Sequence, residues 1–419
     1  MKNKFKHTFR LSFLAVFLVL TGCACTSTSC EVQAAENTAS KTETKAVPEI
    51  GHLQDFGEPN VKHLARQLRR LKNGKLPENG RINIIQFGDS HTASDTFTGP
   101  LREQLQQEYG NAGIGWITPM NVRGQGHKLV SFESKGWTLT SSRAETSLIF
   151  PMGGYIATAD RAGARITIDL REESTDEYKV SFWLRGSPAP LGLTDGTGRK
   201  VKLHISRSDK DWALAHAKVK LPFTIEALTR NAPLLGGIWL EKTNNKGVLV
   251  SPIGANGLRQ SVWFKWQKNW TDQLRHTSPD VVIIAYGTNE AFNPDLDIKD
   301  MKNMLHDGIK QVRQAAPKAV IVLLGAPDTV DKKRPATAVC NSTQPEKYKE
   351  MRQAQKEVAQ VEKLLYWDWQ QAMGGDCQML PWNANGLVSN DLIHFTGKGY
   401  EVSAKMFYKD FINYLEDLR

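Results

Sequence analysis

The sequence predicts an α/β protein in which helices cover both faces of a parallel sheet and an all-β region interrupts the chain. Three observations support this prediction. Apolar, β-branched runs at 82–87, 281–285 and 319–324 alternate with stretches of helical periodicity, as expected for buried parallel strands. Between residues 121 and 250, short segments alternate polar and apolar residues without helices between them. A chain of 419 residues also leaves room for two domains.

The N-terminus has the pattern of an export signal. Four basic residues among the first ten precede the apolar run 11–20, which is too short for a stable membrane span. The next residues, Leu20-Thr21-Gly22-Cys23, resemble the bacterial lipobox, which implies cleavage before Cys23 and acylation of that cysteine. We therefore expect residues 1–22 to be a lipoprotein signal peptide and the exported protein to be anchored to a membrane. The alternative is an ordinary secretory leader that is cut near Ala34-Ala35.

Residues 23–50 are rich in Ser, Thr, Lys, Glu and Ala, which is typical of a flexible linker.

Composition argues against a nucleic-acid partner. The formal charge is +10, from 54 basic and 44 acidic residues, but cleavage after residue 22 would remove four basic residues and leave an excess of six. No basic cluster is interleaved with aromatic residues, so we expect no nucleic acid to bind.

Five cysteines are present. Cys23, Cys25 and Cys30 lie near the leader, whereas Cys340 and Cys377 lie in the body of the chain. No CxxC pair occurs, so we expect no structural zinc or other metal site. In an oxidising compartment Cys340 and Cys377 can form a disulfide, and the alternative is two separate buried thiols.

The first part of the α/β domain has a simple pattern. A helix is predicted at 61–71, where the leucines share one face. The first strand of the parallel sheet ends at Gly88, and a helix follows at 97–109 with Pro100 in its first turn.

The sequence pattern in the middle of the chain predicts short strands. Alternation is clearest at 165–170, 179–184, 200–205 and 218–221, with turn residues between these segments. The pattern predicts an inserted β-sandwich over residues 121–250.

Helical periodicity then returns. Helices are predicted at 258–274, 298–315, 345–361 and 398–418, separated by the two later apolar strands. We assign the tryptophans of 258–274 and the aromatic residues of 366–369 to the core and not to a sugar-binding platform. The β region is therefore inserted into one α/β domain that begins before it and ends after it.

Three polar segments follow predicted elements where an α/β sheet builds a site. Ser90, directly after the first strand, is a candidate nucleophile, and the alternative is a helix cap. Asn289 follows the strand at 281–285, where its amide can donate to an oxyanion, and the alternative is a simple turn. Asp391 and His394 can face one way, so that the carboxylate orients an imidazole that takes the serine proton, although this spacing also occurs in surface turns.

Together, Gly88-Asp89-Ser90, Gly287-Thr288-Asn289 and Asp391-Leu392-Ile393-His394 resemble the motifs of the SGNH (GDSL-like) hydrolase family. The resemblance implies a three-layer α/β/α fold with a parallel sheet. It also implies that residues 51–120 and 251–419 form one hydrolase domain around the insert at 121–250.

The resemblance further implies the residues of the site. The implied catalytic triad is Ser90, Asp391 and His394, and the implied oxyanion hole is Ser90, Asn289 and a glycine between the insert and the next helix. We choose Gly257 for this glycine, with Gly254 as the alternative. No cofactor is implied.

Two departures narrow the family. His91 follows Ser90 where GDSL lipases often carry Leu, and Glu290 replaces the more usual Asp after Asn289. The Gly-Asp-Ser-His sequence at 88–91, the Gly-rich segment 110–115 and the β insert resemble the peptidoglycan O-acetylesterases of Gram-negative bacteria. That resemblance implies removal of acetyl groups from the 6-hydroxyl of N-acetylmuramic acid through an acetyl-enzyme on Ser90. It also implies a periplasmic location, which agrees with the leader, and an insert that resembles a carbohydrate-binding module. We expect a monomer whose lipid anchor lies in the outer membrane.

Other functions fit fewer of these residues. Asp89 and His91 also fit the first motif of metallophosphoesterases, but the segment after the second strand lacks the histidine expected there. No Gly-x-Ser-x-Gly elbow of an α/β-hydrolase occurs. An acetyltransferase, an esterase for another acetylated glycan or lipid, and a non-catalytic cell-wall-binding lipoprotein remain as alternatives.

Overall fold

The computed structural model describes residues 52–77, 80–145, 147–187, 190–207, 212–244, 246–266, 270–334 and 343–418. The predicted signal peptide at 1–22, the linker at 23–50, Cys23 and Cys340 lie outside these ranges. Cys377 is disulfide-bonded, and its pairing with Cys340 stays a prediction. Among the described residues, no helix has the length and hydropathy that crossing a bilayer requires.

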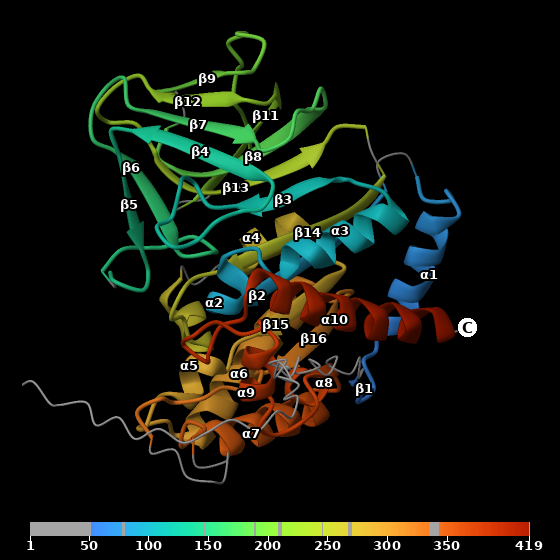
Figure 1. Ribbon diagram of the computed structural model, residues 1–419. Helices are drawn as coiled ribbons and strands as arrows, with labels where there is room; N and C mark the ends of the chain where they lie inside the picture. The colour runs from blue at the N-terminus through green and yellow to red at the C-terminus, as the bar shows by residue number, and fades with distance from the viewer. Residues whose placement is uncertain are drawn as a thin grey trace, which may run out of the picture. The chain divides into compact units, whose positions relative to one another are not determined.

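A parallel sheet forms the centre of the α/β domain (Figure 1). In spatial order its strands are β1 (Leu53–Asp55), β17 (Leu365–Asp368), β16 (Val320–Gly325), β15 (Val281–Ala285), β2 (Arg81–Gly88) and β14 (Gly247–Gly254). β1 pairs antiparallel with β17, and the other neighbouring pairs are parallel. Numbered along the chain, the parallel strands have the order 2-1-3-4-5, as in a doubly wound sheet. The strand order reverses between β2 and β15, which is the topological switch point of the sheet.

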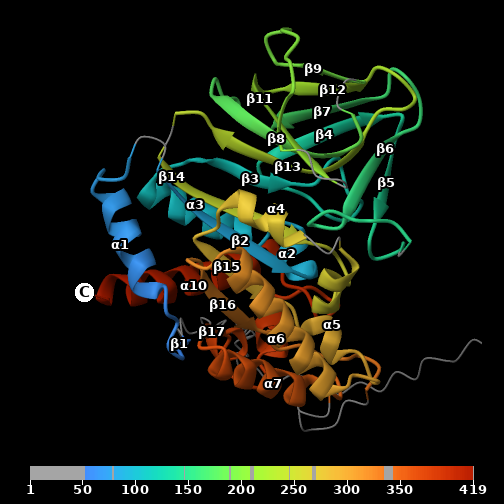
Figure 2. The same cartoon turned by 180° about the vertical axis from the view of Figure 1, so that it is seen from behind.

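Helices cover both faces of this sheet. The helical elements are α1 (Val61–Lys72), α2 (Ser90–Ala93), α3 (Thr98–Tyr109), η1 (Gln260–Lys265), α4 (Trp270–Thr277), α5 (Thr288–Ala291), α6 (Ile298–Ala315), α7 (Tyr348–Val361), α8 (Trp369–Ala372), α9 (Met379–Ala384) and α10 (Gly397–Asp417). Figures 1 and 2 show α3 and α10 on one face and α4 and α6 on the other. The predicted three-layer fold is confirmed.

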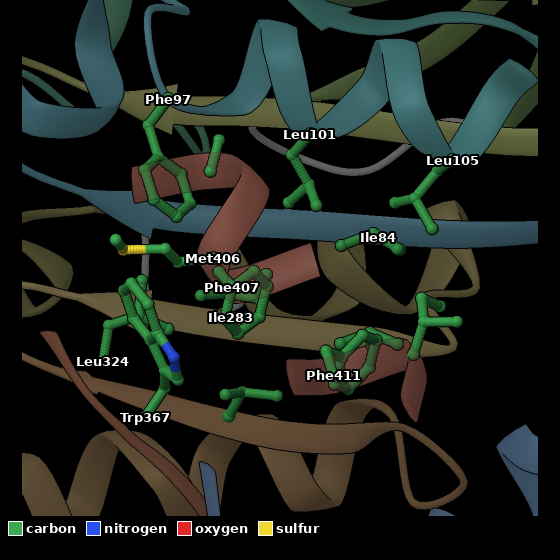
Figure 3. Close-up of a cluster of buried hydrophobic side chains, with 14 of the residues drawn as sticks. Ile84, Phe97, Leu101, Leu105, Ile283, Leu324, Trp367, Met406, Phe407 and Phe411 are labelled. Atoms are coloured by element: carbon green, nitrogen blue, oxygen red, sulfur yellow. The ribbon is translucent and has the colours of Figure 1, made fainter. Parts of the chain in front are cut away.

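Alternation along the strands produces the two cores. Ile84 and Ile283 point to the face that α1, α3 and α10 cover, as Figure 3 shows with Phe97 and Phe407. Their neighbours in sequence, such as Ile85, belong to the core beneath η1, α4, α6 and α7. Strands buried on both faces must be largely apolar, which is why β15 and β16 are continuous apolar runs. The two buried polar residues of β2, Asn83 and Gln86, donate amide N–H groups to the carbonyl of Thr277 and to Thr92 Oγ1.

The insert consists of two antiparallel sheets. One has the order β10-β11-β8-β13-β6-β5, with β3 also paired to β13, and the other has the order β4-β7-β12-β9. The strands are β3 (Gly113–Ile117), β4 (Val130–Lys135), β5 (Trp137–Ser141), β6 (Tyr155–Ala159), β7 (Arg165–Leu170), β8 (Glu177–Arg185), β9 (Leu191–Thr194), β10 (His204–Arg207), β11 (Ala213–Lys220), β12 (Phe223–Ala227) and β13 (Leu234–Lys242). Residues of both sheets share one hydrophobic core, as in a β-sandwich.

The edges of the insert differ from the predicted limits of 121 and 250. β3 already pairs with β13 of the insert, although it precedes residue 121. β14 begins at Gly247 and pairs with β2, so the chain re-enters the parallel sheet before residue 250. Both strands are short apolar segments that fit either sheet in the sequence, and their partners decide the assignment.

The predicted helix at 258–274 is wrong as a single element. Its first part is the 3₁₀ helix η1, and Trp266 then adopts an extended backbone (φ −77°, ψ 164°) and bridges to Phe150 of the insert. The assignment of its tryptophans to the core is confirmed, because Trp263, Trp266 and Trp270 are all buried.

A buried ion pair connects the segment after α2 to the sheet. The Arg102 guanidinium donates to both carboxylate oxygens of Asp95 (2.7 and 2.9 Å) and to the carbonyl of Val250 in β14 (3.1 Å). Burial alone would raise the pKa of Asp95, but the Arg102 charge and its hydrogen bonds hold that pKa well below its usual range. Asp95 also accepts from the backbone N–H of Lys128 (3.1 Å), at the start of the insert.

Replacement of Arg102 by Ala is expected to lower the free energy of unfolding by about 3–5 kcal/mol, because it leaves the buried Asp95 carboxylate without its partner. Denaturant unfolding followed by tryptophan fluorescence measures the change. Lys405→Ala breaks the exposed Lys405–Glu401 pair and should cost about 1 kcal/mol or less. Equal losses in the two variants would contradict this account.

Candidate active site

Ser90 lies at the switch point of the central sheet, where the strand order reverses. β2 ends at Gly88, and Asp89 caps the short helix α2 by accepting a hydrogen bond from the backbone N–H of His91 (2.9 Å). Ser90 is therefore the first residue of this helix, half-buried at the carboxyl edge of the sheet. A Cβ at Gly88 would lie 2.1 Å from Thr92 Oγ1 and 2.8 Å from the carbonyl oxygen of Ala285, so only glycine allows α2 to turn back this closely onto the strand.

Asp391 and His394 lie on a tight turn before α10. The Asp391 carboxylate accepts hydrogen bonds from the backbone N–H groups of Ile393 (3.0 Å) and His394 (2.9 Å). Partial burial disfavours the charged carboxylate, but these bonds and the His394 side chain hold the pKa of Asp391 below its usual value. The turn thus presents an ionised carboxylate at neutral pH.

The structure brings Ser90, His394 and Asp391 into one hydrogen-bonded chain. His394 Nε2 lies 2.7 Å from Ser90 Oγ, and His394 Nδ1 lies 2.6 Å from Asp391 Oδ2. An ionised carboxylate only accepts hydrogen bonds, so Nδ1 carries the proton and Nε2 of the neutral imidazole accepts from the serine hydroxyl. This is the tautomer that a general base needs in order to take a proton from Ser90.

A second group of residues faces Ser90 across a cavity of about 580 Å³. Gly257 follows β14, and Asn289 follows β15 in α5. Both line this cavity together with Ser90 and His394. Gly257 has a φ of +73°, in the left-handed region that favours glycine. Gly254, the alternative to Gly257, lies further back, where a Cβ would lie 2.9 Å from Thr92 Cβ.

The loops after β14 and β15 are clamped together by buried hydrogen bonds. Glu290 accepts from the backbone N–H groups of Gln260 (2.8 Å) and Gly287 (3.0 Å). Asn289 donates one amide N–H to the carbonyl of Leu258 (2.9 Å), which leaves its second N–H for the cavity. Burial raises the pKa of Glu290, but the backbone donors partly offset this. The clamp fixes Asn289 relative to the loop that contains Gly257.

The comparisons with known proteins identify the family. Residues 112–224 match the family described as peptidoglycan O-acetylesterase, N-terminal, and residues 225–402 match the GDSL-like lipase/acylhydrolase family. A solved structure of a peptidoglycan O-acetylesterase is 33% identical with a TM-score of 0.77, over 87% of this chain and 99% of that one. The chain belongs to the peptidoglycan O-acetylesterase family.

Two other solved structures are less similar to this peptidoglycan O-acetylesterase family member. A putative GDSL-like lipase from Parabacteroides merdae is 18% identical with a TM-score of 0.32, over 42% of this chain and 74% of that one. An acetyl xylan esterase is 13% identical with a TM-score of 0.30, over 39% and 80% of the two chains. A comparison with curated proteins finds no match.

His91, which follows Ser90 in this O-acetylesterase family member, is buried and uncharged. Burial and the neighbouring His394 lower the pKa of His91 to about 3. Its Nδ1 lies 2.8 Å from the hydroxyl of Tyr400, and its ring centroid lies 5.4 Å from that of His394. A neutral ring in this place packs beside His394 without competing for the Ser90 proton.

Several residues at the cavity were not found from the sequence. Gly124 and Arg143 of the insert line it, and so do Phe292 and Tyr400. No motif surrounds them, and their position depends on how the insert packs on the α/β domain. Among the described residues, no group of three His, Cys, Asp or Glu side chains is placed to hold a metal ion.

Asp89 gives this site a pH dependence that can be measured. Burial raises the pKa of Asp89 to about 8, above its unfolded value of about 4. The folded state therefore binds the proton more tightly, so the contribution of Asp89 to stability is present below about pH 4 and is lost as the pH rises toward 8.

We expect Asp89→Asn, which is isosteric and keeps a cap, to become progressively more stable than the unmodified protein between about pH 4 and pH 8. The difference should grow by up to about 1.4 kcal/mol per pH unit. Denaturant unfolding at several pH values measures it. A difference that stays constant with pH would mean that Asp89 titrates as an ordinary surface carboxyl.

Proposed function

We propose that the protein is a serine esterase that removes O-acetyl groups from the 6-hydroxyl of N-acetylmuramic acid in peptidoglycan. The observation that carries the proposal is the hydrogen-bonded chain from Ser90 Oγ through His394 to Asp391, in a member of the peptidoglycan O-acetylesterase family. This chain is the arrangement that serine hydrolases use for acyl transfer.

Acylation follows from the protonation states. Ser90 Oγ attacks the acetyl carbonyl carbon while His394 Nε2 takes the hydroxyl proton. Asp391 holds the Nδ1–H and stabilises the imidazolium that forms. His394 then returns the proton to the sugar oxygen as the C–O bond breaks, which releases the 6-hydroxyl and leaves acetyl-Ser90.

The oxygen of the tetrahedral intermediate carries a negative charge, which hydrogen-bond donors must stabilise. The backbone N–H groups of Ser90 and Gly257 and the free amide N–H of Asn289 are the proposed donors. The Ser90 N–H is at the start of α2, where the first amides of a helix have no partner within it. Because Glu290 clamps the loops, the donors need little reorganisation as charge develops.

Deacylation repeats the steps with water. His394 Nε2 takes a proton from a water molecule whose oxygen attacks the acetyl carbonyl. The second tetrahedral intermediate expels Ser90 Oγ, which takes back the proton from His394, and acetic acid leaves as acetate after ionisation. No residue outside the triad has to supply or remove a proton at the serine.

The location and organisation of the protein are part of the proposal. A peptidoglycan substrate and the basic, apolar N-terminus support an exported protein that is anchored through Cys23, with the outer membrane as the proposed location. We also propose a monomer, with Cys340 as the disulfide partner of Cys377. The proposed insert, 121–250, contains most of the sandwich core, to which Ile114, Ile117 and Met120 add from just before it.

Ser90→Ala is expected to abolish acetate release from O-acetylated peptidoglycan and from a small aryl acetate, because no nucleophile remains to form the acyl-enzyme. Acetate is measured enzymatically. Ser134→Ala removes an exposed hydroxyl from β4 and should retain the activity. Unchanged turnover by Ser90→Ala would overturn the triad. Faster release from acetylated xylan or a lysophospholipid than from peptidoglycan would overturn the substrate.

Asn289→Ala is expected to lower kcat by roughly 10²- to 10³-fold with little change in KM, because one oxyanion donor is lost. The matched control is Arg259→Ala, which removes a bond between the same two loops, from Arg259 Nε to the carbonyl of Asn289 (3.2 Å). If both variants lose activity equally, loosening of the loops explains the loss and not the missing donor.

A further inference from the structure

An arginine of the insert reaches the cavity that contains the triad. Arg143 lies in the turn that follows β5, where its backbone N–H donates to Ser141 Oγ (3.2 Å). The backbone N–H groups of Ala144 and Glu145 both donate to the carbonyl of Ser141 (3.1 Å each). These bonds hold the turn in one conformation, so the position of Arg143 is set by the insert.

The guanidinium of Arg143 lies against Gly257. A Cβ at residue 257 would be 2.9 Å from Arg143 Cζ and 3.0 Å from Arg143 Nη2. Any side chain at this position would therefore displace the guanidinium, independently of the left-handed backbone that already favours glycine there. Arg143 is thus placed beside the proposed oxyanion hole, on the rim of the cavity.

Arg143 has no carboxylate partner among the described residues. None of the ion pairs or side-chain hydrogen bonds in this part of the chain uses its guanidinium. Among the described residues that line the cavity, no Asp or Glu occurs, and Arg143 is the one with a permanent charge. A guanidinium with open donors favours a carboxylate or another charged oxygen acceptor, which it can bind in a bidentate manner.

We infer that Arg143 binds a carboxylate of the substrate and so selects acetyl esters of acidic sugars over those of neutral sugars. The inference rests on the proposed function and names the group that is recognised. In N-acetylmuramic acid without a stem peptide, that group is the free carboxyl of the lactyl ether at C3, which N-acetylglucosamine lacks. Where a stem peptide is attached this carboxyl is an amide, so the inference applies to glycan from which the peptide has been removed. A cavity of about 580 Å³ is of the size that holds a small ligand.

The test compares two soluble esters that differ in the lactyl ether at C3, 6-O-acetyl-N-acetylmuramic acid and 6-O-acetyl-N-acetylglucosamine. The measured quantity is the ratio of kcat/KM for the acidic ester to kcat/KM for the neutral one. Arg143→Gln should lower this ratio by roughly 10- to 100-fold, as expected for loss of a charge-assisted hydrogen bond. Arg143→Lys keeps the charge but not the bidentate geometry and should give an intermediate ratio.

Arg230→Gln is the matched control, because it removes the same charge from an exposed loop of the insert between β12 and β13. Its ratio should equal that of the unmodified protein. An unchanged ratio in Arg143→Gln, or an equal fall in Arg230→Gln, would overturn the inference while leaving the esterase intact. If an aryl acetate is cleaved but neither sugar ester is, the proposed function fails, and this inference fails with it.

Discussion

The site depends on the register of three neighbouring parallel strands. Gly254 of β14 pairs with Gly88 of β2, and Gly88 pairs in turn with Ala285 of β15. The three strands therefore end at one level, and the loops that follow them begin side by side. A slip of one residue in either pair would exchange the side chains that pack under α3 and α10 with those that pack under α4 and α6, so close packing on both faces holds the register. The positions of Ser90, Gly257 and Asn289 follow from this alignment.

Buried polar groups make the alignment rigid at a cost in free energy. Asp89 and Glu290 lie beside the proposed nucleophile and the proposed oxyanion loop, and burial raises the pKa of both carboxyls. Each is compensated by backbone N–H groups that would otherwise have no partner at the ends of short helices or turns. The polar residues around Ser90 and His394 thus act mainly on the backbone, and the proposed proton transfer involves Ser90 and His394 alone.

The sequence predicts the parts of the fold and site that local patterns determine. β2, β15 and α6 were predictable because a strand buried on both faces and an amphipathic helix each leave a periodic signature. The break at Trp266 and the pairing of β3 with β13 were not, because they depend on residues far away in the chain. The same distinction holds in the site. Each predicted motif follows a recognisable strand or turn, whereas the place of Arg143 depends on how two domains pack.

The pairing of β3 with β13 also bears on how the chain can fold. β2 and β14 are neighbours in the sheet, yet the whole insert separates them in sequence, so their contact closes a long loop with a corresponding loss of entropy. β3 and β13 lie near the two ends of the insert and pair antiparallel, with Ile117 opposite Ile238. An insert that has folded therefore brings Gly113 beside Glu241, so the loop that remains to be closed consists of the segment from Gly88 to Gly113, with α2 and α3, and the short segment from Glu241 to Gly247. Prior folding of the sandwich therefore removes most of the chain length that separates β2 from β14, and lowers the entropy cost of their parallel pairing.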